Sequence, residues 1–300
     1  MDGVIMHKIT NYKKEFSSNK VEALALYNNE QFSFEYYHLF KEHSLHINLD
    51  GEEEIKLLYF LLKGKCEFYL DNERIVLEPF ELLEINTTSG FNIYALEEIS
   101  LLYISLSDSK INLKTDELSK QIERLENKDD YLKGHNYRVS KYALIILEEM
   151  GLKLNTDNLN YAASYHDIGK IKISPDIVHK ESSLTPKEFE VMKMHPIYSY
   201  EIIKPILGED IAYIAKCHHE KLDGSGYPLH LKGDAIPIEA QIIAVADIFD
   251  ALTTKRTYRD AYSFNDAIKI MEADVINHKI NKEAYNALKK AINDDLIKLN

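Results

Sequence analysis

His166-Asp167-Ile168-Gly169-Lys170 is the stretch that decides the fold and chemistry of the second half of the chain. It places two metal-ligating side chains next to each other where a helical pattern ends, with Gly169 as the expected stop of the helix. Two adjacent ligand side chains can point into one cleft at such a helix end. A lone histidine is more often a hydrogen-bonded core or surface residue, so the meaning of this doublet depends on the residues around it.

The helical half contains further side chains of the same kind. His218-His219 stands at the expected end of another helix, just before the turn-rich residues 223–228. Asp247 follows the apolar residues 242–246, where an unpaired carboxylate is costly unless a cation or a donor meets it. Five imidazoles and two carboxylates suit Fe, Mn or Zn better than Mg or Ca. The full candidate set is His135, His166, Asp167, His195, His218, His219 and Asp247.

Six ordered segments of this half resemble the HD superfamily of phosphohydrolases, and specifically its HD-GYP branch. A HisAsp doublet alone is a weak signal, whereas six segments in the family's order, with an intact Gly-Tyr-Pro, are a strong one. The resemblance covers about residues 128–290. Its segments are His135-Asn136-Tyr137-Arg138-Val139, His166 to Lys170, Met194-His195-Pro196, His218-His219-Glu220, Asp223 to Pro228, and Val245 to Thr253, followed by Arg256-Thr257-Tyr258-Arg259.

The resemblance implies an all-α phosphodiesterase domain with a binuclear metal centre. Asp167 would bridge the two metals. His135, His166 and Asp247 would complete one site, and His195, His218 and His219 the other. Two metals about 3.5–4 Å apart can generate a hydroxide and clamp both reacting oxygens of a phosphodiester. Fe or Mn is the expected metal, with Zn as the alternative.

Three cationic side chains are expected to contact the substrate. Lys170 lies three residues after Asp167, and we assign it and Asp167 to catalysis. Its structural alternative is a solvated lysine that interacts with a helix dipole. Arg256 and Arg259 suit planar recognition of phosphate or guanine, with surface salt bridges as their alternative.

Two positions limit what the resemblance implies. Some family members have a glutamate one helical turn before the first histidine, which allows a third metal, but Tyr131 stands there in this chain. Asp129 and Asp130 have the wrong offset for the same helical face. Two metals are therefore expected. Gly226-Tyr227-Pro228 is expected to form a turn. The resemblance implies that this segment shapes the site or docks partners without binding metal, and Tyr227 is expected to take no catalytic part.

The first 110 residues have the pattern of an all-β domain. Short apolar runs at residues 57–62, 82–85 and 101–106 are separated by turn signals, which favours a barrel or sandwich. Residues 60–68 resemble the strand-Gly-strand signature of cupins, and Asp71-Asn72 resembles their next hairpin. The cupin metal pattern is not met, because His43 and His46 lack the usual spacing. A sensory or dimerising barrel is therefore expected, with a passive scaffold as the alternative.

The remaining expectations concern organisation. The chain has 300 residues, which fits two domains: a cupin-like barrel at 1–110 and an HD-GYP helical domain at 128–300. Leu118, Ile122 and Leu125 predict an amphipathic connector helix at 111–127, and this helix is a candidate homodimer seam. The barrel is the candidate receptor of a small-molecule effector. A net charge of −13 argues against binding nucleic-acid polymers or membranes, and a cytoplasmic protein is expected.

Three functions remain open at this point. The preferred one is hydrolysis of cyclic di-GMP to linear pGpG, with GMP as a further product, in second-messenger signalling. The second is hydrolysis of another cyclic dinucleotide, such as cyclic GMP-AMP, by the same ligands. The third is a signalling module that binds metal and nucleotide without turnover, but such a module has little need for all seven ligands.

Overall fold

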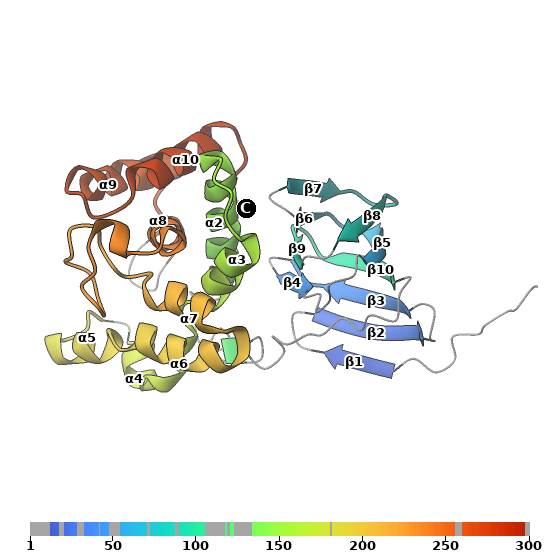
Figure 1. The fold of residues 1–300 in the computed structure, drawn as a ribbon, viewed down its shortest axis with the longest axis horizontal. Coiled ribbons are helices and arrows are strands. Elements are labelled where there is room, and N and C mark those ends of the chain that lie inside the picture. The colour runs from blue at the N-terminus through green and yellow to red at the C-terminus, as the bar shows by residue number, and fades with distance from the viewer. Residues whose placement is uncertain are drawn as a thin grey trace, which may run out of the picture. The chain divides into compact units, whose positions relative to one another are not determined.

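The computed structural model describes residues 13–17, 21–28, 33–41, 43–47, 55–70, 73–87, 90–105, 118, 121–122, 134–180, 182–255 and 260–297. The chain divides into two compact units, Met1–Lys114 and Thr115–Asn300 (Figure 1). Within the described residues, every helix is too short or too polar to cross a membrane.

The first unit is all β, as the sequence predicted. One six-stranded antiparallel sheet has the order β1-β2-β3-β10-β5-β8, and a four-stranded sheet has the order β4-β9-β6-β7. The strands of the first sheet are β1 (Lys13–Ser17), β2 (Val21–Asn28), β3 (Ser33–Leu39), β5 (Ile55–Lys63), β8 (Leu82–Thr87) and β10 (Ile99–Ser105). Those of the second are β4 (Ser44–Ile47), β6 (Cys66–Leu70), β7 (Glu73–Leu77) and β9 (Phe91–Ala95).

Alternation of buried and exposed side chains builds the core of this unit. In β10, Ile99, Leu101 and Tyr103 are buried while the residues between them are partly exposed, which is the period of a half-buried strand. The same alternation buries Leu57, Tyr59 and Leu61 of β5. These residues form one apolar cluster with Phe68 and Phe91 of the other sheet, so the two sheets share a core.

The second unit is built from helices whose ends match several sequence signals. Thr185 forms the expected capping box with Glu188. Gly151, with a φ of 64°, ends the helix His135–Met150 as expected. The helices are α2 (His135–Met150), α3 (Thr156–Tyr165), α4 (Pro175–Val178), α5 (Pro186–Met192), α6 (His195–Leu207), α7 (Glu209–Lys216), α8 (Ile238–Thr253), α9 (Phe264–Ile276) and α10 (Lys282–Asn293). Two 3₁₀ turns, η1 (Ile168–Lys172) and η2 (Gly233–Ala235), join them.

Helix α2 is the central element of this unit. It packs against α3, α8 and α10, and its buried face includes Val139, Ile145 and Ile146. Helix α6 packs against α7 and η1. These contacts bring the first turn of α2, the end of α3, the first turn of α6 and the middle of α8 to one region of the unit.

Some predicted features lie outside the described residues, namely Leu125, Asp129, Asp130, Tyr131, the Asp71-Asn72 hairpin, Arg256 and Arg259. Of the predicted connector helix, the structure describes Leu118, Gln121 and Ile122, all helical, with both apolar side chains buried.

Candidate metal centre

Gly169 was wrongly predicted to stop a helix. Helix α3 already ends at Tyr165, and Gly169 lies inside the 3₁₀ turn η1. A Cβ at this position would lie 2.1 Å from the His195 carbonyl oxygen and 2.4 Å from the Ser199 nitrogen. Glycine is therefore required by the close approach of α6, and it lets the turn that carries Asp167 pack directly on the helix that carries His195.

Ser199 holds this turn in place from α6. Its hydroxyl donates to the backbone oxygen of His166 at 2.6 Å and accepts from the Gly169 nitrogen at 2.9 Å. His166 and Asp167 are both buried, so the two bonds fix the backbone on either side of two buried functional side chains. No sequence pattern pointed to Ser199, because its contribution depends on how α6 crosses the turn.

The structure brings all seven predicted ligands together in two groups. In the first, His135, His166 and Asp247 offer ligand atoms that lie within 4.8 Å of one another. His135 comes from the first turn of α2, His166 follows α3, and Asp247 lies in α8. The Nε2 atom of His135 lies 3.5 Å from Asp247 Oδ1.

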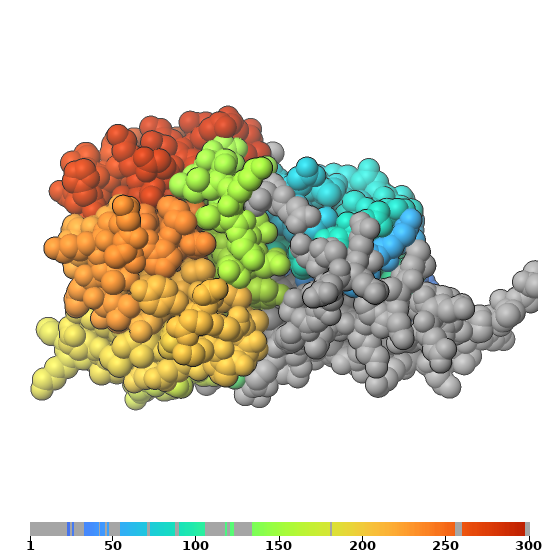
Figure 2. Space-filling model, viewed as in Figure 1, coloured from blue at the N-terminus to red at the C-terminus, as the bar shows by residue number. Residues whose placement is uncertain are grey.

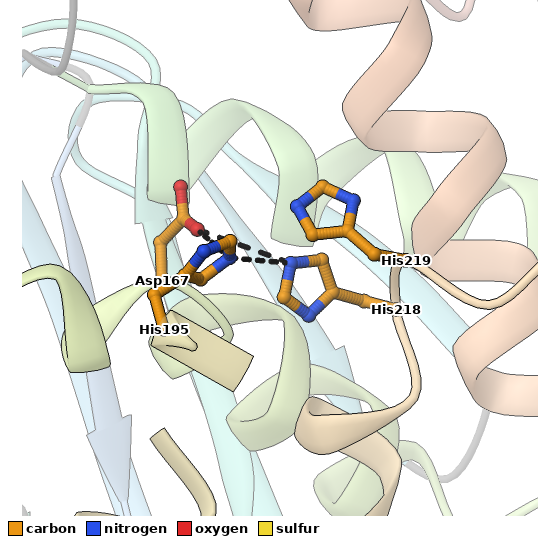
Figure 3. Close-up of side chains that lie close together, drawn as sticks. All are labelled: Asp167, His195, His218 and His219. Carbon is orange, nitrogen blue, oxygen red and sulfur yellow. Dashed lines mark hydrogen bonds and ion pairs between the residues drawn. The ribbon is translucent and has the colours of Figure 1, made fainter. Parts of the chain in front are cut away.

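The second group consists of Asp167, His195, His218 and His219, again within 4.8 Å of one another (Figure 3). His195 Nε2 lies 3.1 Å from Asp167 Oδ1 and 3.3 Å from His218 Nε2. His218 and His219 follow the end of α7, and their ring centroids lie 4.0 Å apart. This group therefore combines a helix start, a helix end and a 3₁₀ turn.

Asp167 faces both groups with different oxygen atoms. Its Oδ2 lies 3.6 Å from Nε2 of His135 and 3.6 Å from Nε2 of His166. Its Oδ1 faces the other way, 3.1 Å from His195 Nε2 and 3.9 Å from His218 Nε2. A carboxylate shared in this manner is the arrangement that a bridge between two metal ions requires.

Hydrogen bonds to backbone carbonyl oxygens orient three of the imidazole rings. Nδ1 of His166, His195 and His218 donates to the backbone oxygens of Ala163, Met192 and Ala215, at 2.7, 2.8 and 2.6 Å. A carbonyl only accepts, so Nδ1 carries the proton and Nε2 is left as the lone-pair donor toward the centre. His166 Nε2 is buried and has no hydrogen-bond partner among the described residues, which fits a metal ligand.

Burial and neighbouring charges keep these side chains in the protonation states that bind metal. Burial lowers the pKa of His218 and His219 well below the usual value, and also lowers that of His166, so these imidazoles are neutral at pH 7. Burial alone would raise the pKa of Asp167, but Lys170 and the surrounding histidines hold it well below the usual range. A neutral imidazole and an ionised carboxylate are the forms that bind metal.

Asp250 is a site residue that the sequence reasoning missed. It is fully buried one helical turn after Asp247 in α8, and its Oδ2 accepts from His135 Nδ1 at 2.8 Å. Arg138 donates to the same carboxylate from Nε at 2.6 Å and from a terminal nitrogen at 3.1 Å. Burial opposes the charge on Asp250, but the bonds from His135 and Arg138 keep its pKa below the usual value. The spacing of Asp247 and Asp250 was the available signal.

Asp250→Asn is expected to weaken metal binding by about 10- to 100-fold, because carboxylates that orient ligand histidines typically contribute that much. The amide keeps the volume of the carboxylate but removes the charge that supports His135. Competition with a chelator measures the affinity. Partly exposed Asp274→Asn on α9 is the control, and equal affinities in the two variants would contradict the role of Asp250.

Lys170 contacts Asp167 in this structure. Its Nζ donates to Asp167 Oδ2, and its side chain remains 18% exposed. The ammonium group is therefore at the centre, on a side chain that is partly open to solvent, as a substrate contact requires.

The Gly226-Tyr227-Pro228 loop is tied to the centre by its backbone. Buried Glu220 accepts from the Leu229 and Leu231 nitrogens at 2.6 and 3.0 Å. The Tyr227 ring lies 4.8 Å from the His219 ring, and its nitrogen donates to the His219 oxygen at 3.3 Å. Burial, together with Asp167 and Asp247, raises the pKa of Tyr227, so its hydroxyl stays protonated.

Several proteins of similar sequence have names that specify a cyclic dinucleotide phosphodiesterase. Over 172 residues the chain is 38% identical to the 3'3'-cGAMP-specific phosphodiesterase 3 of Vibrio cholerae, covering 56% of this chain and 37% of that protein. It is 39% identical to the cyclic di-GMP phosphodiesterase response regulator RpfG of Xanthomonas campestris, covering 52% of this chain and 42% of that one. A cyclic di-GMP phosphodiesterase of Thermotoga maritima is 39% identical, at 56% and 48% coverage. The chain thus spans less than half the length of these relatives.

Two further comparisons concern the separate units. A cupin superfamily protein of Desulfitobacterium hafniense is 22% identical and has a TM-score of 0.28, covering 31% of this chain and 84% of that one. The family model described as HD domain matches residues 120–282, which is more than half of the chain. The chain therefore belongs to the HD domain family.

Proposed function

We propose that this protein is a metal-dependent phosphodiesterase that hydrolyses cyclic di-GMP to linear pGpG, with GMP as a further product. The observation that carries the proposal is the position of Asp167, whose two oxygens face two separate sets of ligands. A site with one metal does not need this division. Two divalent transition-metal ions, Fe or Mn and alternatively Zn, suit a donor set of imidazoles and carboxylates without thiolate.

His135, His166 and Asp247 would hold one ion, and His195, His218 and His219 the other, with Asp167 shared. When bound, the two ions supply a nucleophile at neutral pH and neutralise charge on the reacting phosphate oxygens. Lys170 would move from Asp167 to a phosphate oxygen and stabilise the charge that develops there. The backbone bonds behind the histidine rings keep the ligands in place, so little rearrangement accompanies the reaction.

A second cyclic dinucleotide, cyclic GMP-AMP, is the other candidate substrate. It is supported by the 38% identity to a relative whose name specifies 3'3'-cGAMP. Both substrates present the same phosphodiester to the centre, so the ligand set agrees with each of them. The discriminating contacts are those to the bases.

Product analysis tests the proposed function directly. The protein is purified without oxygen, loaded with Fe, Mn or Zn, and incubated with cyclic di-GMP, cyclic GMP-AMP and cyclic di-AMP. We expect about two ions per chain and linear dinucleotide from at least the first substrate. Two bound ions with no product from any cyclic dinucleotide would overturn the proposal, and would favour a binding module.

Lys170→Ala is expected to lower kcat by about 10²- to 10³-fold, the usual loss for one group that stabilises transition-state charge. The metal content should stay near that of the wild type, because Lys170 is not a ligand. Lys172→Ala is the matched control, since Lys172 is exposed and pairs with Glu201 at 2.8 Å and with the Tyr198 ring rather than with a ligand of the centre. Loss of metal from the Lys170 variant would mean that this residue has a different role.

The role of the β unit stays a prediction. A small-molecule effector of the barrel and a homodimer through residues 111–127 are both tested by comparing the full chain with one that begins at residue 128. Altered turnover or a lost dimer would support these predictions, and identical behaviour across a ligand screen would leave the barrel as a scaffold.

A further inference from the structure

A row of aromatic rings leads from the metal centre to the surface. It begins at His219, whose ring lies 4.8 Å from the Tyr227 ring. Tyr227 in turn lies 6.4 Å from Phe189, with the two ring planes at 79°. Phe189 belongs to α5, which reaches the surface of the helical unit in the yellow part of Figure 2. Three adjoining rings thus connect a predicted metal ligand to solvent.

The exposure of Phe189 is unusual for this side chain. It is 43% exposed, whereas phenylalanine is among the residues most often buried. In its edge-to-face pair with Tyr227, Phe189 keeps part of its ring exposed to solvent, and that part can contact another planar group. An aromatic ring beside the place where a phosphate is expected is suited to stacking with a nucleobase.

Lys193 adds a charge to the same surface. Its Nζ lies 5.0 Å from the Phe189 centroid and 6.0 Å from that of Tyr227. Lys193 also forms an ion pair with Glu190 at 2.6 Å, and Glu190 is 69% exposed. Such a surface pair is weak and can rearrange when a ligand arrives. Guanine presents two acceptors, O6 and N7, to a lysine, whereas adenine presents an amino group beside N7.

We propose that Phe189, Tyr227 and Lys193 form the subsite for one guanine base of the substrate. Phe189 and Tyr227 provide the stacking surface, and Lys193 donates to the guanine acceptors. This inference rests on the proposed function, because the base is placed by a phosphate at the adjoining metal centre. It assigns specificity to residues that precede His195 and follow His219 in sequence.

Kinetics of Phe189 variants test the subsite. Phe189→Ala is expected to raise KM for cyclic di-GMP by about 5- to 150-fold, as lost base stacking does. Phe189→Tyr should restore it. Inhibition by inorganic phosphate, which has no base, should be unchanged, as should the metal content. Val191→Ala is the matched control, because Val191 lies on the same helix and is also 43% exposed. Lys193→Gln should reduce the preference for cyclic di-GMP over cyclic di-AMP by about tenfold.

Fluorescence gives an independent reading. The chain has no tryptophan, so Phe189→Trp introduces a single indole at the subsite. A phosphorothioate analogue of cyclic di-GMP should quench this indole by stacking, and should quench the indole of Val191→Trp little. If the wild type hydrolyses cyclic di-GMP while Phe189→Ala keeps its KM and both indoles respond equally, the subsite is wrong and the function stands. If the wild type hydrolyses no cyclic dinucleotide, the function fails, and the quenching still decides whether the base binds here.

Discussion

Asp167→Asn is expected to reduce phosphodiesterase turnover by about 10³-fold or more and to lower the metal content from about two ions to at most one per chain. The reason is that each carboxylate oxygen faces a different set of histidines, at 3.6 Å from His166 and 3.1 Å from His195. An amide has the same shape but only one good ligand atom and no charge. Loss of several kcal/mol of charge stabilisation corresponds to a rate change of that size.

The control for this variant is Asp176→Asn, which removes one exposed carboxylate from α4 and leaves the centre intact. Elemental analysis and single-turnover kinetics are measured on both variants. Circular dichroism shows whether the Asp167 variant is folded. Two firmly bound ions and wild-type turnover in Asp167→Asn would exclude a bridging role.

Gly169→Ala is expected to damage the centre although it changes no ligand. The added methyl group would overlap the His195 carbonyl oxygen and the Ser199 nitrogen, so α6 must move away from η1. Such overpacking costs typically about 1–3 kcal/mol, equivalent to roughly 2–12 °C in Tm for a domain of this size. Because His195 moves with α6, a displacement near 1 Å would lower kcat by about 10²-fold. Thermal unfolding and kcat measure the two effects.

Gly151→Ala separates stability from activity. Gly151 has a φ of 64° and no atom within 4 Å of the Cβ position, so alanine there strains the end of α2 without steric overlap. This variant should lose about 1–2 kcal/mol of stability and keep its kcat. If Gly169→Ala were no less active than Gly151→Ala, the tight contact between η1 and α6 would have no part in positioning His195.

Sequence patterns predicted the later strands of the β unit better than the earlier ones. Residues 57–62, 82–85 and 101–106 correspond to β5, β8 and β10, and each is marked in the sequence by a short, mostly apolar run. Strands β1 to β3 were not predicted individually. In β3, residues Ser33–Leu39 include five positions that are only partly exposed rather than clearly in or out, so the period-two signal is weak. Their pairing with β10 is a long-range feature that no local window contains.

For the candidate site, the sequence by itself determined the seven ligand candidates and the family to which the helical half belongs. These follow from residue types in a fixed order, which a linear pattern can express. Only the tertiary structure decided that Asp167 divides its oxygens between two groups, that Asp250 and Arg138 support His135, and that Phe189 adjoins Tyr227. Each of these contacts joins segments far apart in the chain, and their distances depend on how α2, α5, α6 and α8 pack. Gly169 is a further example. Its position in the sequence predicted a helix end, whereas in the structure the close approach of α6 excludes any side chain there.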